Sequence, residues 1–135
     1  MPIAKLPSSP PAPAWDSALQ EFLLVKQAEG RAPRTIKDYR RHVTAFFSEH
    51  AEAWPEYHAL RQAVRSHFAG LAQKSATTYN LRREYLKAFF AWCVSEGYLA
   101  GNPTQGVPKR KNEGQPRDIG QDAIQKLLSL PQKNT

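Results

Sequence analysis

The chain has 135 residues, a net charge of +7 and 41% hydrophobic residues. This length suits one domain with its own hydrophobic core and flexible ends. No run reaches the roughly 18 apolar residues that a membrane span requires. The N-terminus has no apolar segment of a secretory signal, so we expect a cytoplasmic protein. The single Cys93 excludes an internal disulfide, and we interpret it as a reduced core thiol.

The positive charge is concentrated in three short segments of the chain. Thirteen of the 19 Lys and Arg residues fall within residues 31–41, 74–87 and 109–117. Such clustering is typical of proteins that bind the phosphate groups of nucleic acids. A solvated basic surface without a partner is the alternative interpretation.

Residues 1–14 contain five prolines and few residues to bury, and we expect a disordered leader there. A first helix is predicted from Asp16 to Ala28, with Asp16 or Ser17 as N-cap and Gly30 just beyond its end. Its acidic character favours core packing or contact with another subunit over DNA reading.

A second helix is predicted from Pro33 to about His50, because proline suits the first turn of a helix. Five apolar residues share one side of this helix and predict a buried stripe: Ile36, Tyr39, Val43, Phe46 and Phe47. The opposite side carries three bases: Arg34, Lys37 and Arg41. The helix is therefore predicted to have one buried and one basic side.

A third helix is predicted to open at Pro55, with Gly70 in its last turn. A fourth helix is predicted after the N-cap Ser75, ending at Gly97. Its first half is polar and basic, whereas its final turns form a buried cluster: Phe89, Phe90, Trp92, Cys93 and Val94. The wide apolar arc leaves the directions of Arg82 and Arg83 open.

Beyond Pro103, a polar segment that reaches Asp118 has the composition of a linker. A short amphipathic helix is then predicted at Gln121–Leu130. Strand patterns are absent from the sequence, so we predict an all-α fold of four helices, with a fifth beyond the linker.

Three stretches together resemble the N-terminal core-binding domain of tyrosine recombinases (phage-type integrases). They are Arg31–Arg41 with its Pro-x-Thr and Tyr-Arg, Ser75–Trp92, and Glu96–Pro103 with the basic segment that follows. The resemblance implies an orthogonal, SAM-like four-helix bundle over residues 15–103, a basic linker over 104–118 and the start of a truncated catalytic domain over 119–135. The chain departs from the family at several positions: Ala32, Arg83, Tyr85 and Asp118-Ile-Gly.

In this family the domain clamps one face of a DNA duplex, with its second and fourth helices towards the major groove. The resemblance implies partners of two kinds, a recombination-site duplex and other recombinase subunits assembled on it, with the isolated fragment monomeric. Membrane partners and cofactors are not expected. The expected DNA-binding residues are Arg34, Thr35, Lys37, Arg41, Lys74, Ser75, Thr77, Thr78, Asn80, Arg82, Arg83, Lys87, Lys109, Arg110 and Lys111. Arg83 is either an additional DNA contact or an edge of the core.

The family's chemistry requires a tyrosine nucleophile and a set of partners that includes a His-x-x-Arg motif. His58-Ala-Leu-Arg61 matches that motif, but it lies in the third predicted helix without the accompanying residues. Since His42, His50 and His67 show no metal-ligand spacing with Cys or acids, no metal site is predicted. We therefore expect a DNA-binding fragment without catalytic activity. The alternative is a helical protein-interaction module that docks through the first and fifth helices.

Overall fold

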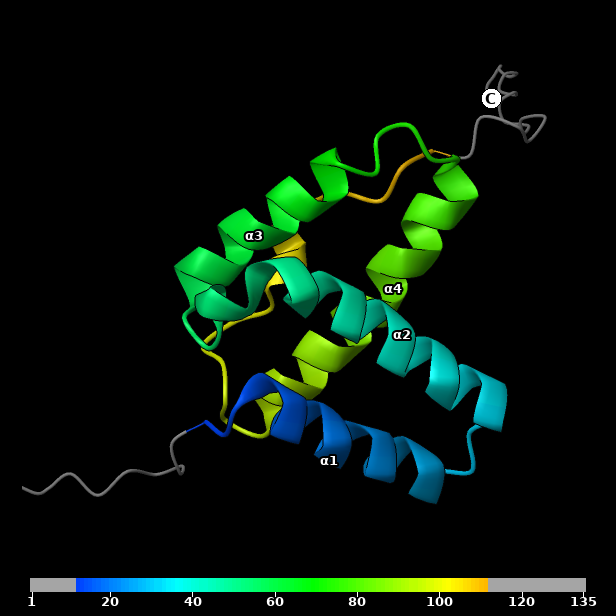
Figure 1. Cartoon of the computed structure of the whole chain (residues 1–135), viewed down its shortest axis with the longest axis vertical. Coiled ribbons are helices and arrows are strands. Elements are labelled where there is room, and N and C mark those ends of the chain that lie inside the picture. The colour runs from blue at the N-terminus through cyan, green and yellow to red at the C-terminus, as the bar shows by residue number, and fades with distance from the viewer. Residues whose placement is uncertain (1–11, 112–135) are drawn as a thin grey trace, which may run out of the picture.

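The computed structural model describes residues 12–111, and within this range it contains helices and no strand. The elements are α1 (Trp15–Ala28), α2 (Pro33–His50), the 3₁₀ helix η1 (Ala51–Ala53), α3 (Tyr57–Ala69), α4 (Ala76–Ser95) and the 3₁₀ helix η2 (Pro103–Gly106). The predicted all-α fold with four helices is confirmed. The predicted fifth helix, and residues 112–118 of the predicted linker, lie outside the described residues. Figure 1 shows α1 and α2 side by side, with α4 running across them.

None of the helices within residues 12–111 combines the length and the apolar composition that crossing a bilayer requires.

The first helix starts earlier than predicted. Its N-cap is Ala14, which offers no side-chain hydrogen bond, and the predicted caps Asp16 and Ser17 lie inside the first turn. Asp16 accepts a hydrogen bond from the Ser17 N–H at 2.9 Å. The Trp15 ring stacks on Phe47 with 4.7 Å between centroids, so a tertiary aromatic contact accompanies the earlier start.

The third helix starts later than predicted, at Tyr57 and not at Pro55. Its N-cap is Glu56, whose carboxylate accepts hydrogen bonds from the His58 and Ala59 N–H groups at 3.1 and 2.8 Å. These bonds lower the pKa of the Glu56 carboxyl group. Pro55 belongs to the turn before the helix, where its lack of a backbone N–H breaks no helical hydrogen bond.

Both predicted ends of α4 are confirmed. The Ser75 hydroxyl accepts a hydrogen bond from the Thr78 N–H at 3.1 Å and thereby caps the helix start. At the other end, Gly97 has a φ of +83°, a conformation that glycine adopts without strain. The next N–H, that of Tyr98, donates to the Cys93 carbonyl at 2.9 Å, which completes a Schellman motif.

The core is predominantly aromatic, and α4 supplies its centre. Five phenylalanines from α1, α2 and α4 are at most 1% exposed: Phe22, Phe46, Phe47, Phe89 and Phe90. The Phe89 ring meets Phe22 edge-on at 5.4 Å, and Phe90 meets Phe46 edge-on at 5.9 Å. Cys93 is fully buried beside them, and this burial raises the pKa of its thiol. The predicted aromatic half of α4 is therefore the point where three helices meet.

Two histidines are packed against this core. The His67 ring lies edge-on to Phe46 at 5.3 Å, and His42 stacks on Tyr85 at 4.9 Å. Burial lowers the pKa of both imidazoles, because it disfavours the charged form. Nearby His50 lowers the pKa of His67 further. The folded domain therefore favours the neutral form of His42 and His67.

The fold brings together a histidine–carboxylate cluster that the sequence did not predict. Ligand atoms of Glu49, His50 and His67 lie within 4.8 Å of one another, although α2 and α3 are separate in the chain. The His50 Nε2 and Glu49 Oε1 atoms are 3.9 Å apart. The expectation that His50 and His67 have no acidic partner at such a distance is therefore wrong, because the fold brings both beside Glu49.

The aromatic core predicts a large difference between two substitutions in α4. Phe89→Ala should lower the free energy of unfolding by about 3–5 kcal/mol, because it leaves a cavity among three helices. Leu81→Ala is the matched control, because Leu81 is 51% exposed. It should change stability by less than about 0.5 kcal/mol in the same urea titration. Equal losses in the two variants would contradict this description of the core.

The lowered pKa values of the half-buried His42 and His67 predict that acid destabilises the domain. A histidine whose folded-state pKa is lowered binds its proton more readily in the unfolded chain. The free energy of unfolding should therefore be highest above the ordinary histidine pKa of about 6.5. It should fall as the pH drops towards the lower pKa of the folded state. Urea unfolding measured on both sides of that pH checks this expectation. His67→Gln should flatten the pH dependence, whereas a change at exposed His58 should not.

Candidate nucleic-acid interface

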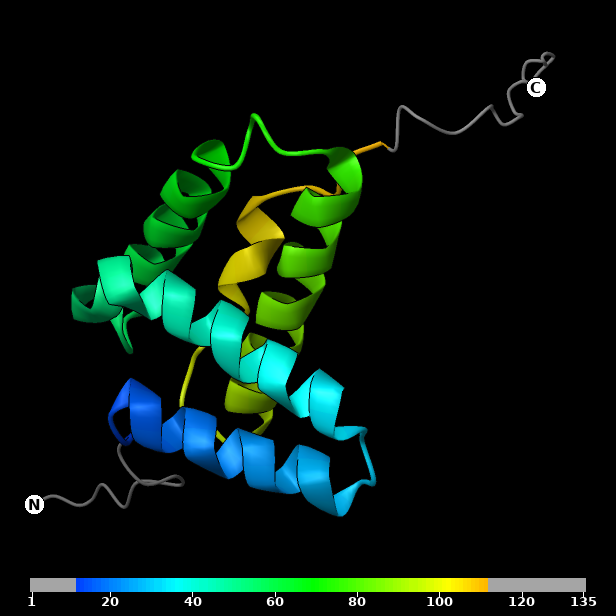
Figure 2. The ribbon, with the colours of Figure 1, turned by 45° about the vertical axis from the view of Figure 1, so that its right-hand side comes forward.

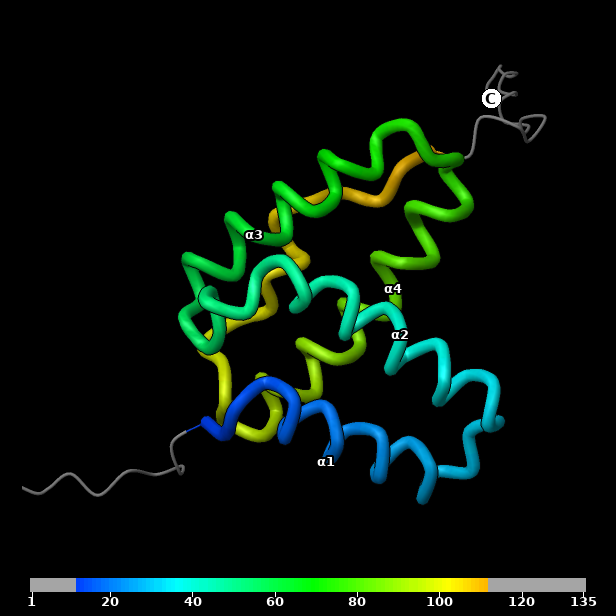
Figure 3. Tube along the Cα trace, in the orientation of Figure 1, coloured from blue at the N-terminus to red at the C-terminus, as the bar shows by residue number. Residues whose placement is uncertain are grey.

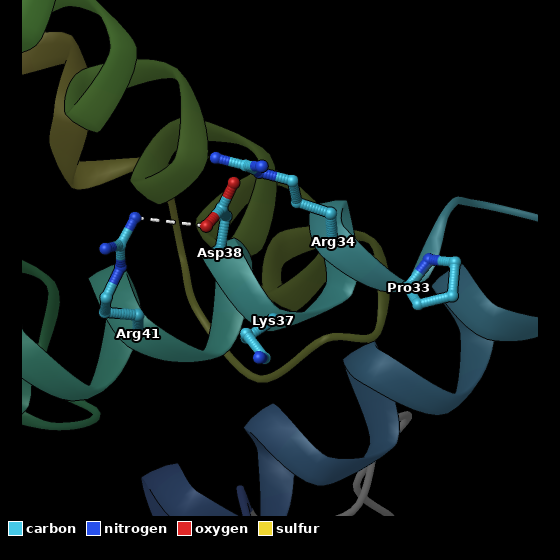
Figure 4. A pocket seen from close by; sticks show the side chains of 5 residues that line it. All are labelled: Pro33, Arg34, Lys37, Asp38 and Arg41. Carbon is cyan, nitrogen blue, oxygen red and sulfur yellow. Dashed lines mark hydrogen bonds and ion pairs between the residues drawn. The ribbon is translucent and has the colours of Figure 1, made fainter.

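The outer side of α2 carries an open basic groove with a volume of about 480 Å³ (Figure 4). Its lining consists of Pro33, Arg34, Lys37, Asp38 and Arg41. The three bases are spaced at i, i+3 and i+7, which places them along one side of the helix. All three are exposed, so their charged groups are accessible to a polyanion.

Asp38 is the one acid among the described residues that line this groove, and two other residues use its carboxylate. Arg41 donates to Asp38 through Nη2 at 3.0 Å, and the Tyr85 hydroxyl of α4 donates at 3.3 Å. Burial, together with the Asp38 charge, raises the pKa of the Tyr85 phenol. Arg41 remains 68% exposed at its side chain. Asp38 therefore ties α2 to α4 and orients Arg41 without covering it.

The start of α4 is a second polar and basic region. Lys74, Ser75 and Thr77 are exposed there, and Thr78 is half-buried. The Ser75 hydroxyl donates to Thr78 Oγ1 at 3.2 Å while it caps the helix. The unpaired N–H groups of a helix start carry a partial positive charge, which favours phosphate oxygens.

Residues 107–111, here called the strap, lie along the first half of α4 as an ordered segment. The Asn80 side chain donates to the Arg110 carbonyl at 2.7 Å and accepts from the Arg110 N–H at 2.8 Å. Arg83 donates through Nε to the Val107 carbonyl at 2.9 Å. The predicted linker segment is therefore packed onto the domain as far as its described part extends.

Three further contacts fix the same segment. The Tyr79 hydroxyl donates to the Pro108 carbonyl at 3.0 Å. The Arg110 guanidinium lies over the Tyr79 ring at 5.1 Å and donates to the Lys74 carbonyl at 2.9 Å. Figure 3 traces the strap, in orange, to the start of α4. The Arg110 contact with the Lys74 carbonyl thus brings the strap, with its exposed Lys109 and Lys111, to the start of α4.

The structure gives the direction of Arg83, which the helical wheel left open. The Arg83 side chain is only 13% exposed and points to the strap, so it lies at a packed edge. Arg82 is half-buried, and its positive charge contributes to the lowered pKa of His42 and of His67. Lys87 is exposed further along α4, and Thr35 is half-buried at the start of α2.

Most of the expected DNA-binding residues therefore fall into two groups, whereas Lys87 lies in the second half of α4. One group follows the first turns of α2, and the other gathers at the start of α4 with the strap. Figures 1 and 2 show the starts of α2 and α4 on the same side of the domain. Sequence reasoning missed Asp38, Tyr79 and Tyr85 as residues that position these bases. In the sequence, the only indication of this role is that each carries a polar group beside the buried apolar side of its helix.

Comparison with known proteins identifies the family to which this helical domain is similar. Residues 19–97 match the family described as phage integrase, N-terminal SAM-like domain. The chain is 32% identical over 127 residues to tyrosine recombinase XerC of Yersinia pestis, covering 88% of this chain and 40% of the relative. It is 31% identical over 131 residues to tyrosine recombinase XerC of Serratia marcescens, covering 90% and 42%.

The chain thus spans about two-fifths of the length of these curated relatives. No solved structure gives a significant match. The family match covers more than half of the chain, and residues 19–97 include most of α1 and all of α2, α3 and α4. The chain belongs to the phage integrase N-terminal SAM-like domain family.

Proposed function

We propose that the chain is the duplex-DNA-binding N-terminal domain of a site-specific tyrosine recombinase. In this proposal α2 and α4 face the major groove of a recombination-site arm. The observation that carries it is the position of both basic helix starts on one side of the domain (Figures 1 and 2). Together they offer cations and helix-start N–H groups to the phosphates of a duplex.

The proposed phosphate contacts come from three parts of the fold. They are Arg34, Thr35, Lys37 and Arg41 of α2, Lys74, Ser75, Thr77, Thr78, Arg82 and Lys87 at and along α4, and Lys109 and Lys111 of the strap. Because these contacts release bound counterions from DNA, affinity should fall steeply with salt concentration. Base reading requires side chains that reach the groove floor, for which the arginines of α2 have suitable donors.

We assign no catalytic role to the His58-Ala-Leu-Arg61 motif. His58 is exposed in the first turn of α3, and its ring packs on Tyr57 at 5.2 Å. Arg61 is half-buried, and its Nε atom has no hydrogen-bond partner among the described residues. In this proposal the domain binds a duplex in the cytoplasm without cleaving it.

Assembly with other recombinase subunits on DNA is also part of the proposal. Leu24 and Val25 of α1 are neighbouring apolar residues that are 56% and 37% exposed. This pair favours a protein contact, and it is the specific feature behind the alternative of a protein-interaction module. Separate substitutions in α2 and in α1 distinguish DNA binding from protein interaction.

Neutralising the α2 groove should weaken duplex binding. In a plot of the logarithm of affinity against the logarithm of salt concentration, the slope of the Arg34→Gln/Lys37→Gln variant should be shallower by about 0.9 for each lost phosphate contact. Fluorescence anisotropy with a labelled mixed-sequence duplex measures this slope. Arg65→Gln, which removes an exposed base of α3, is the matched control. DNA binding through α2 would be contradicted if the affinity of the unaltered chain did not depend on salt. It would also be contradicted if Arg65→Gln reduced the slope as much as the α2 variant does.

Changing the apolar pair of α1 should affect assembly and leave the single-domain affinity intact. Leu24→Asp introduces a charge into an exposed apolar site, so a protein contact there should be lost. In gel-shift titrations, binding to a one-arm duplex should be unchanged. Cooperative binding of two domains to a duplex with two adjacent arms should decrease. Loss of one-arm binding would instead show that α1 faces DNA.

A further inference from the structure

We infer that Asn80 is a positioning residue for DNA binding and acts on DNA through the strap. In this inference Asn80 touches no base; it holds residues 107–111 so that Lys109 and Lys111 meet the phosphate backbone beside the start of α4. The inference rests on the proposed function and names the residues that complete its interface.

The hydrogen bonds of Asn80 argue against base reading. An asparagine that reads adenine uses its amide nitrogen and its carbonyl oxygen together. Both atoms of Asn80 are already paired with the backbone of Arg110, at 2.7 and 2.8 Å. Asn80 is half-buried, so turning it towards DNA would leave two backbone groups of Arg110 without these partners.

The side-chain directions within the strap supply the second step. Arg110 points inwards, over the Tyr79 ring and onto the Lys74 carbonyl. Lys109 and Lys111, on either side of it, are exposed, whereas Arg110 is half-buried. The charged groups of the two lysines are therefore accessible to a ligand. The strap therefore presents two cations outwards and uses the third as an anchor.

Anchoring matters because it removes an entropic cost from binding. A lysine on an untethered segment must be ordered when it meets a phosphate, and that ordering reduces affinity. The Asn80 pair, the Arg83 bond to Val107 and the Tyr79 bond to Pro108 order the strap before DNA arrives. The two lysines thereby join Lys74 in one preformed cationic surface.

A double-mutant cycle tests this inference. Asn80→Ala should weaken binding to any duplex by about 3–10-fold, because the strap lysines must then be ordered on binding. Lys109→Gln/Lys111→Gln should lower the salt slope by about 0.9 per residue. Adding Asn80→Ala to that variant should cause little further loss, because the strap no longer carries contacts to position.

One control variant and one companion variant accompany the cycle. The control, Gln73→Ala, removes an exposed amide close to α4 and should leave affinity unchanged. Tyr79→Phe removes only the hydrogen bond to Pro108 and should reproduce a weaker form of the Asn80→Ala effect. Amide hydrogen exchange at Arg110 should accelerate in both Asn80→Ala and Tyr79→Phe while the unfolding transition remains cooperative.

The outcomes separate this inference from the proposed function. If the unaltered chain shows no salt-dependent duplex binding, the proposed function itself fails. If the chain binds DNA but Asn80→Ala keeps its full penalty in the Lys109→Gln/Lys111→Gln background, Asn80 contacts DNA directly and the inference is overturned. A penalty that changes with the base sequence of the duplex, or unaltered exchange at Arg110, would also overturn it.

Discussion

The edge-on packing of Phe89 and Phe90 against α1 and α2 is the interaction on which this domain depends. These two rings meet Phe22 and Phe46 at 5.4 and 5.9 Å, and all four are fully buried. Because they lie in the last turns of α4, they fix one end of that helix inside the core. The opposite end of the same helix is then held at the surface, where Ser75 caps it and Lys74 precedes it.

A few polar contacts extend this order from the core to the surface. The Tyr85 hydroxyl reaches Asp38 across the α2–α4 boundary, and Asp38 in turn orients Arg41. On the other side of α4, Asn80 and Arg83 hold the strap. The helix α4 therefore positions both α2 and the strap, which carry the basic side chains. A surface arranged in this way needs little reordering when it meets a rigid, charged duplex.

The sequence predicted the features that depend on local chemistry. Helical periodicity identified the buried side of α2, and a serine cap and a terminal glycine located both ends of α4. The starts of α1 and α3 were misplaced by one to two residues: α1 begins beside the Trp15–Phe47 stack, and α3 is capped by Glu56, one residue beyond Pro55.

The strap was the largest feature that sequence could not predict. Its proline and three basic residues have the composition of a linker, and nothing local indicates that Asn80 binds Arg110 thirty residues later. The same long-range contact gives Asn80 and Arg83 different surroundings from those of the exposed α2 bases. Residue types that suit DNA binding are thus a reliable guide to a basic surface, whereas their individual roles depend on tertiary hydrogen bonds.

DNA binding through α2, α4 and the strap is tested most directly by an NMR titration of the isotope-labelled chain with a duplex, followed through backbone amide shifts. The largest shifts should fall in residues 33–41, 74–87 and 107–111, whereas the last turns of α4 and the exposed side of α3 should change little. Shifts centred on α1 or α3, with the starts of α2 and α4 unaffected, would contradict this mode of binding.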